Sequence, residues 1–65
     1  MLDGTQRSEI YPGLKVAIVT KADQPTGKAT YGIVKEILTN AATHPNGIKV
    51  RLESGEVGRV RYIEV

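Results

Sequence analysis

The chain has 65 residues, with nine Lys and Arg against seven Asp and Glu, one His and no Cys, for a formal net charge of +2. This length allows a single domain, and a chain this short buries only about 60% of the surface that it exposes when unfolded. The absence of Cys excludes disulfides and thiolate metal sites, and no apolar run approaches the ~20 residues of a membrane-spanning helix. The small basic excess permits nucleic-acid binding without requiring it.

The N-terminal residues 1–9 are polar and show no apolar period, so we expect a loosely held arm followed by one domain over residues 10–65. The start of the chain also lacks the charged and apolar regions of a signal peptide, which leads us to expect a soluble, cytoplasmic protein. Tyr11-Pro12-Gly13 predicts a turn. Apolar residues then alternate along Leu14–Thr20, a pattern that predicts a half-buried strand.

The next strand is predicted over residues 31–38, after a polar loop at residues 21–30. Its apolar residues Val34 and Ile37 are three apart instead of two, which indicates a bulge or a sharp bend. A helix is the alternative interpretation of this spacing. We reject it because the segment is short, rich in β-branched residues and opened by Gly32.

The C-terminal third is predicted to form a hairpin. A second polar loop, residues 39–47, ends in the turn dipeptide Asn46-Gly47 and leads into a clearly alternating strand at residues 48–53. Ser54-Gly55 predicts a two-residue turn, from which residues 56–60 return as a strand. Residues 61–65 are expected to form a short turn and a closing strand.

The register of this hairpin can be inferred from its side chains. A two-residue turn sets Leu52 opposite Val57, with both side chains inward. Strict continuation would place Val50 opposite a charged residue, so we predict a β-bulge at Gly58-Arg59 that restores an apolar partner. The basic residues that would then project from the outer face of the hairpin are Lys49, Arg51, Arg59 and Arg61.

About five short strands with Gly-rich turns in so short a chain predict an all-β fold, a small antiparallel barrel of SH3-like type that removes its sheet edges by closing. An OB-fold is less favoured because it normally needs a longer chain and a helix.

Four runs of the sequence carry a resemblance to a known family: Asp23-Gln24-x-Thr26-Gly27-Lys28, Gly32-Ile33-Val34-Lys35-x-Ile37-Leu38-Thr39, His44-Pro45-x-Gly47-Ile48-Lys49-Val50-Arg51-Leu52 and Gly55-x-Val57-Gly58-Arg59-Val60. Together they resemble the YwbE-like family of small uncharacterised proteins from bacteria and archaea, over roughly residues 10–63. The stretch Ala29-Thr30-Tyr31 departs mildly from that pattern. The resemblance implies no established activity. More distantly, the Gly-rich strands are similar to KOW-type and other SH3-like barrels, many of which bind RNA or ribosomal proteins, but a fold does not fix a function.

The basic face of the hairpin is the main candidate site, because the planar guanidinium group of Arg matches the geometry of phosphate. We expect RNA phosphates to be contacted by Lys49, Arg51, Arg59 and Arg61, with Lys35 on the neighbouring strand and Lys28 and His44 in the loops as supporting residues. Gly58 would allow a ligand to approach closely, while Gly47 and Gly55 serve the turns. The alternative is an ordinary solvated strand face, balanced by Glu36, Glu53 and Glu56.

The histidine and the tyrosines give weaker indications of a functional site. A single His without Cys cannot anchor a metal site, so His44 is expected to hydrogen-bond within its own loop. Tyr31 and Tyr62 are expected to fill the core with their hydroxyl groups reaching water, although exposed aromatic rings stack on bases in RNA-binding barrels. Tyr11 stays undecided between the core and the surface.

These observations favour a monomeric barrel that binds RNA or a ribonucleoprotein surface, with no enzyme activity, no cofactor and no membrane partner. The alternative is a protein-interaction module that uses the groove between loops 21–30 and 39–47. A polyproline ligand is disfavoured because the chain has no Trp and few aromatic residues.

Overall fold

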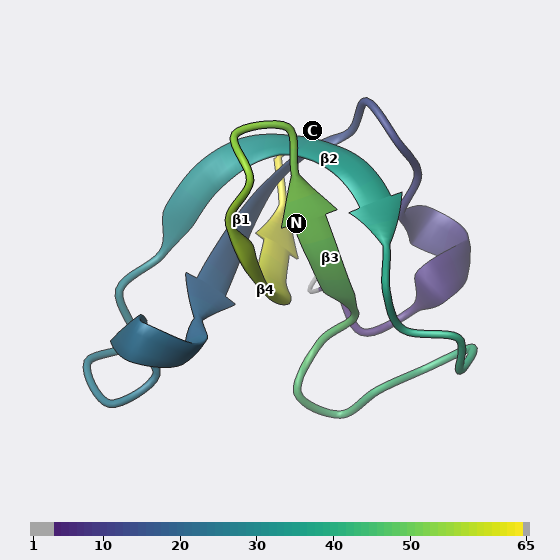
Figure 1. Cartoon of the computed structure of the whole chain (residues 1–65). Coiled ribbons are helices and arrows are strands. Elements are labelled where there is room, and N and C mark those ends of the chain that lie inside the picture. The colour runs from purple at the N-terminus through teal and green to yellow at the C-terminus, as the bar shows by residue number, and fades with distance from the viewer. Residues whose placement is uncertain (1–3, 65) are drawn as a thin grey trace.

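The structure is a computed structural model that describes residues 4–64. In chain order its elements are the 3-10 helix η1 (Arg7–Glu9), strand β1 (Lys15–Thr20), the 3-10 helix η2 (Lys21–Asp23) and the strands β2 (Thr30–Ile37), β3 (Lys49–Leu52) and β4 (Val57–Ile63). The strands pair in the closed order β1-β2-β3-β4, and β4 pairs back onto β1 (Figure 1). All four pairings are antiparallel.

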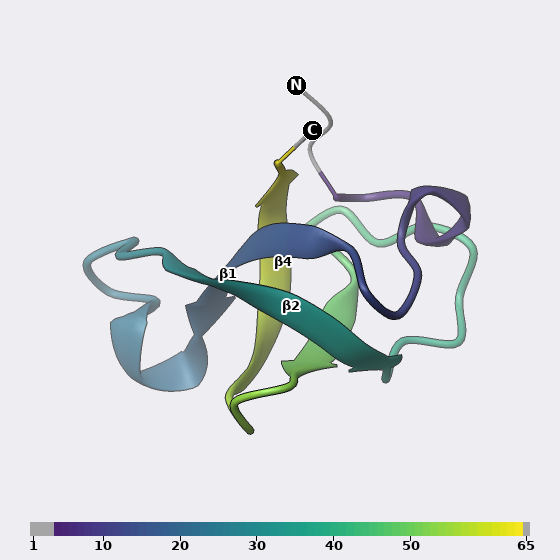
Figure 2. The ribbon, with the colours of Figure 1, turned by 90° about the horizontal axis from the view of Figure 1, so that it is seen from above.

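The expected fold class, a small all-β antiparallel barrel, is confirmed. Figure 2 shows the strands crossing one another at steep angles around a common centre, as barrel closure requires. The barrel has four strands instead of about five, because residues 61–63 continue β4 where a separate turn and closing strand were predicted. Within residues 4–64, no helix has the length and apolar character needed to cross a membrane.

The core of the barrel is aliphatic. In the first strand, Val16 and Ile18 belong to the core cluster as predicted, whereas Ala17 between them is fully buried without belonging to that cluster. The buried side chains of the core cluster are Ile10, Leu14, Val16, Ile18, Val34, Ile48, Val50, Leu52, Val60 and Ile63.

The bulge predicted in the second strand is confirmed. The register of β2 with β3 shifts by one residue between Val34 and Glu36, which makes Lys35 the extra residue. Because of this shift, Val34 and Ile37 both turn toward the core although they are three positions apart.

The predicted two-residue turn at Ser54-Gly55 is wrong by one residue. The backbone N–H of Leu52 donates to the carbonyl of Glu56 (2.8 Å), and the N–H of Gly55 donates to the carbonyl of Leu52 (2.9 Å). The loop therefore comprises residues 53–55 and closes on Gly55, whose φ of 101° lies in the left-handed region. Three-residue hairpin loops commonly end on a glycine in this conformation.

This longer loop changes the register of the hairpin. Val57 lies opposite Arg51, and Gly58 lies opposite Val50 and is buried. The pairing then runs without a break to Lys49 and Arg59, so the bulge predicted at Gly58-Arg59 is wrong. Gly58 also lines one of the surface hollows described below, so its expected role in close ligand approach stays a prediction.

The bulge of β4 lies at Arg61, two residues beyond the predicted Gly58-Arg59. Ile18 pairs with Val60 and Ala17 pairs with Tyr62, which leaves Arg61 as the extra residue of β4. This bulge has the same effect as the bulge in β2: Val60 and Ile63 are both buried although they are three positions apart. The same spacing that revealed the first bulge therefore marks the second.

The N-terminal segment lies against the loop between β2 and β3. The N–H of His44 donates to the carbonyl of Thr5 (2.9 Å), and the N–H of Ile48 donates to the carbonyl of Gly4 (2.9 Å). Residues 1–3 of the expected loose arm lie outside the described residues. Residues 4–9 are joined to the barrel by these backbone hydrogen bonds.

Gly58 provides a test of how tightly the barrel closes. A Cβ at this position would lie 2.6 Å from the carbonyl oxygen of Val19, which is backbone of the neighbouring strand and cannot rotate away. We expect Gly58→Ala to lower the free energy of unfolding by about 1–3 kcal/mol, as overpacking does, measured by urea denaturation. Gly32→Ala is the matched control.

At Gly32 the nearest obstacle to a Cβ is the end of the Leu52 side chain, which can change rotamer. Gly32→Ala is therefore expected to cost less than Gly58→Ala. Equal costs for the two variants would contradict the packing described for Gly58.

Candidate functional site

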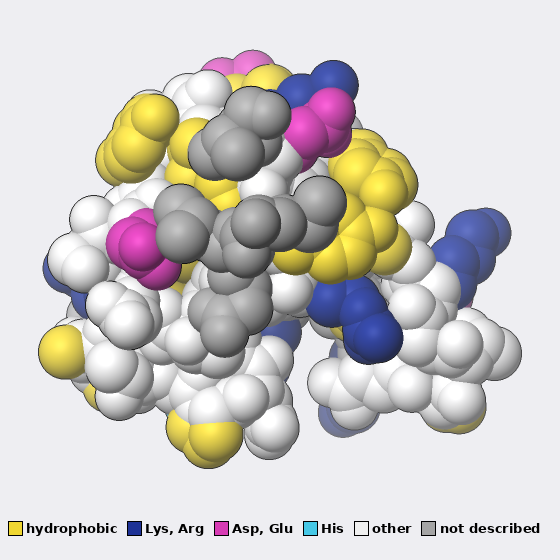
Figure 3. Space-filling model, turned by 180° about the vertical axis from the view of Figure 1, so that it is seen from behind, with side chains coloured by type: hydrophobic (Ala, Val, Ile, Leu, Met, Phe, Trp, Pro, Cys, Tyr) yellow, Lys and Arg dark blue, Asp and Glu magenta, His cyan; other side chains and the backbone are white. Residues whose placement is uncertain are grey.

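Two adjoining hollows of about 350 and 370 Å³ lie against the outer side of β4. They share Val19, Gln24 and Arg59, so together they form one continuous groove. The space-filling view shows the molecule hollowed between two lobes, with Lys and Arg side chains at the margin of the hollow (Figure 3). We call this feature the basic groove, and its lining residues are Val19, Lys21, Gln24, Gly27, Asn46, Lys49, Val57, Gly58, Arg59 and Arg61.

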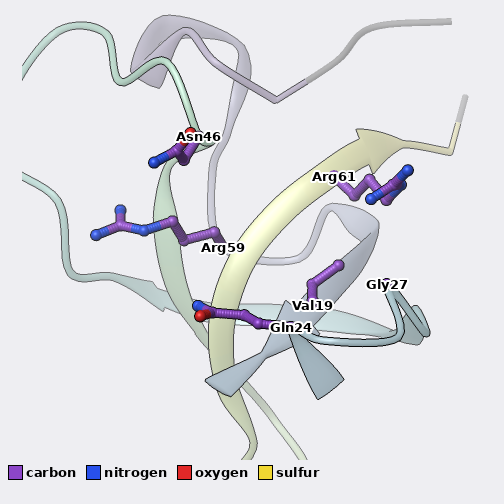
Figure 4. Close-up of a pocket in the computed structure, with 6 residues that line it drawn as sticks. All are labelled: Val19, Gln24, Gly27, Asn46, Arg59 and Arg61. Atoms are coloured by element: carbon purple, nitrogen blue, oxygen red, sulfur yellow. The ribbon is translucent and has the colours of Figure 1, made fainter. Parts of the chain in front are cut away.

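The strand register positions the cationic side chains of the groove. Lys49 and Arg59 are direct cross-strand partners, so both side chains project from the outer face of the hairpin. Arg61, the extra residue of the β4 bulge, turns toward loop 21–30, where its Nη1 lies 3.8 Å from the position that a Cβ on Gly27 would occupy. Figure 4 shows the side chains of Arg59 and Arg61 leaving β4 in opposite directions.

Arg59 also fixes one wall of the groove. Its Nη1 donates a hydrogen bond to the carbonyl of Gly47 (3.2 Å), and the residue is half-buried. Gly47 has a φ of 101° and packs against the backbone of Val60, so a side chain could not be accommodated there. Arg59 therefore holds loop 39–47 against β4. Because a guanidinium group carries five N–H donors, the others remain available to a ligand.

The groove has a clear electrostatic character. Its lining contains four cations and no carboxylate. Two glutamates of the barrel form ion pairs elsewhere, Glu36 with Arg51 and Glu64 with Lys15 (3.8 Å). The positive charge of the groove is therefore not balanced by its own walls, and the site suits an anionic ligand.

The predicted basic residues separate into two groups. Lys49, Arg59 and Arg61 line the groove. Arg51 lies on the same hairpin face, but its guanidinium group forms an ion pair with Glu36 across the β2–β3 pairing. Lys35 is the exposed extra residue of the β2 bulge and does not line the groove.

The predicted loop residues lie outside the lining as well. Lys28 is exposed in the first loop. The Nδ1 of His44 accepts a hydrogen bond from the backbone N–H of Asn46 (3.1 Å), which confirms the role predicted for this ring within its own loop. Lys21, directly after β1, lines the groove and was missed by the sequence analysis. Its position one residue beyond a predicted strand is the signal that could have indicated it.

The tyrosines differ most from the sequence expectation. Tyr31 and Tyr62 are both cross-strand partners of Ala17, so their rings lie on the outer face on either side of that residue. The hydroxyl groups are 2.6 Å apart, and the ring centroids are 6.0 Å apart at an interplanar angle of 59°. Tyr31 is 54% exposed, whereas Ala17 is completely buried. The prediction that Tyr31 fills the core is therefore wrong.

Tyr31 points outward because successive side chains of a strand point to opposite faces. The position after Tyr31 is Gly32, which faces inward against Leu52, so Tyr31 must point outward. Tyr62 is half-buried, and Tyr11, left undecided by the sequence, is 56% exposed.

Contact between the two hydroxyl groups changes the acidity of Tyr31. The side-chain hydrogen bond with Tyr62 raises the pKa of Tyr31 above its ordinary value, and partial burial and the nearby charges of ionised Tyr62 and of Glu64 raise it further. Each of these disfavours the phenolate form.

The fold and the groove together define a small all-β barrel with a basic outer face. The chain belongs to the family described as "Uncharacterized conserved protein (DUF2196)", whose profile matches residues 3–63. It is 56% identical over 62 residues to the "Uncharacterized protein YwbE" of Bacillus subtilis (strain 168), a match that covers 95% of each chain. The resemblance to the YwbE-like family is thus confirmed. No solved structure matches the chain.

The tyrosine pair gives a prediction for alkaline pH. Because the folded-state pKa of Tyr31 is raised, this group stabilises the fold below its unfolded pKa of about 10, and the contribution is lost as pH rises through the folded pKa. We expect Tyr62→Phe to move the pKa of Tyr31 back toward its ordinary value. A spectrophotometric titration of the phenolate band, with Tyr11→Phe as the control, would measure this change. A late-titrating phenol that survives in Tyr62→Phe would contradict it.

Proposed function

We propose that this protein binds RNA, free or in a ribonucleoprotein, through the basic groove. Lys21, Lys49, Arg59 and Arg61 would contact the phosphates. The observation that carries the proposal is the lining itself, which combines four cations with no carboxylate. We further propose that the protein acts as a cytoplasmic monomer without enzyme activity or a cofactor.

A phosphate backbone suits the groove better than a small isolated anion. The cations are spread along two adjoining hollows and do not converge on one point, and a polyanion can use such a row. Arg59 and Arg61 offer planar sets of donors that match phosphate oxygens, and the side-chain amides of Gln24 and Asn46 add further donors.

The proposal narrows the set of residues that the sequence suggested. Arg51 would contribute less than the groove residues, since its ion pair with Glu36 must be broken or shared before it can contact a phosphate. Lys35, Lys28 and His44 are outside the lining, so we do not assign them phosphate contacts.

Charge reversal tests the proposal. We expect Lys49→Glu and Arg61→Glu each to weaken the binding of a labelled RNA by about tenfold at ~0.15 M salt, because a phosphate contact is replaced by repulsion. The slope of log affinity against log salt should fall by about 0.7 per lost contact on a single strand. Fluorescence anisotropy at several salt concentrations gives both quantities.

The matched control is Lys35→Glu, which makes the same change in net charge at an exposed strand position outside the groove. Its affinity should stay near that of the unmodified protein. All three side chains are exposed, so the melting temperatures should also be similar. Equal losses in the three variants would show that net charge alone drives binding and would contradict a role for the groove.

A second candidate function is the binding of a protein segment in the groove between loops 21–30 and 39–47. It is favoured by the position of the groove between the two long loops, since Gln24 and Gly27 come from one loop and Asn46 from the other. Phosphate-driven binding should weaken steeply between low and moderate salt, while a protein contact made mainly by the loops should change little. The salt series on a captured partner therefore separates the two functions.

A further inference from the structure

The outer face of the barrel carries an aromatic surface beside the basic groove. Tyr31 is more than half exposed, yet it lies within a strand and its hydroxyl group is hydrogen-bonded to that of Tyr62. The tilted contact between the two rings restricts Tyr31 from a second side. An exposed ring that is held at both its edge and its hydroxyl group is already ordered for contact with another flat surface, so little side-chain entropy is lost on binding.

This surface adjoins the groove along β4. Tyr62 directly follows Arg61 in β4, and Arg61 lines the end of the groove next to Gly27. In the space-filling view, hydrophobic side chains gather on this face with Lys and Arg side chains at their lower margin, where the molecule is hollowed (Figure 3).

The charges around the tyrosine pair differ between its two ends. On the side of the groove lies Arg61, which has no carboxylate partner among the described residues. On the other side lies Glu64, which is close enough to raise the pKa of Tyr31 and forms an ion pair with Lys15. A polyanion that contacts the rings would therefore extend toward Arg61 and away from Glu64.

We infer that Tyr31, supported by Tyr62, stacks on an unpaired base of single-stranded RNA whose phosphates occupy the basic groove, an inference that rests on the proposed function. Stacking on an aromatic ring suits single strands because every base has a π-face. In an A-form duplex the bases are stacked within the helix, and proteins contact mainly the phosphates and 2′-hydroxyl groups. The tyrosine pair thus favours a single strand over a duplex.

The test compares two labelled probes that share a backbone. One is a single-stranded RNA of mixed sequence and about ten nucleotides, within the usual site sizes, and the other is the same strand with abasic sites throughout. We expect Tyr31→Leu to weaken binding of the first probe by about tenfold and to leave binding of the abasic probe unchanged. Tyr31→Phe, which keeps the ring, should bind the first probe nearly as well as the unmodified protein.

Tyr11→Leu is the matched control, because Tyr11 is exposed to almost the same degree, 56% against 54%, and lies in the turn before β1. Its affinity should be unchanged for both probes. The chain contains no Trp, so tyrosine emission can be followed directly. Quenching by the single strand should occur in Tyr11→Leu and be largely lost in Tyr31→Leu.

The outcomes separate this inference from the proposed function. If Tyr31→Leu binds the single strand as the unmodified protein does, while Lys49→Glu and Arg61→Glu lose binding, the stacking role is wrong and the groove stands. Equal losses on the normal and abasic probes would also overturn stacking. If the unmodified protein binds neither probe, both the stacking role and RNA binding are refuted.

Discussion

Closure of a barrel from four short strands is the constraint on which the rest of this structure depends. The interior is narrow, and it is filled by aliphatic side chains. Two glycines mark close approaches: a Cβ on Gly58 would meet the backbone of Val19, and a Cβ on Gly32 would meet the end of the Leu52 side chain. The core cluster is entirely aliphatic, and the exposed Tyr11 and Tyr31 lie outside it.

The same constraint shapes the candidate site. Strands that curve around so small a core cannot keep a strict two-residue period, and β2 and β4 each insert one extra residue. In β4 this residue is Arg61, and the bulge turns it away from the direction of Arg59 and toward the first loop. The groove therefore has cations on two sides of one strand because the barrel needed a bulge there.

Two ion pairs of the barrel lie away from the groove. The chain has only a small basic excess, which would be unremarkable if it were spread evenly. Glu36 and Glu64 instead pair with Arg51 and Lys15, both outside the groove. Exposed pairs of this kind stabilise a fold little. Because each pair contains one charge of each sign, the net positive charge of the groove comes from its own lining, which has four cations and no carboxylate.

The amino-acid sequence was enough to predict the fold class, the approximate bounds of the strands and the bulge in β2. It could do so because alternating apolar residues, Asn-Gly and Gly-rich turns and the three-residue spacing of Val34 and Ile37 are local signals. It also indicated Lys49, Arg59 and Arg61 as residues of one basic face. Four features were visible only in the folded chain: the hairpin register, the bulge at Arg61, the inclusion of Lys21 in the groove and the outward position of Tyr31. Each of these depends on which distant strand lies alongside, and one residue of slip in a loop reverses the face of every side chain beyond it.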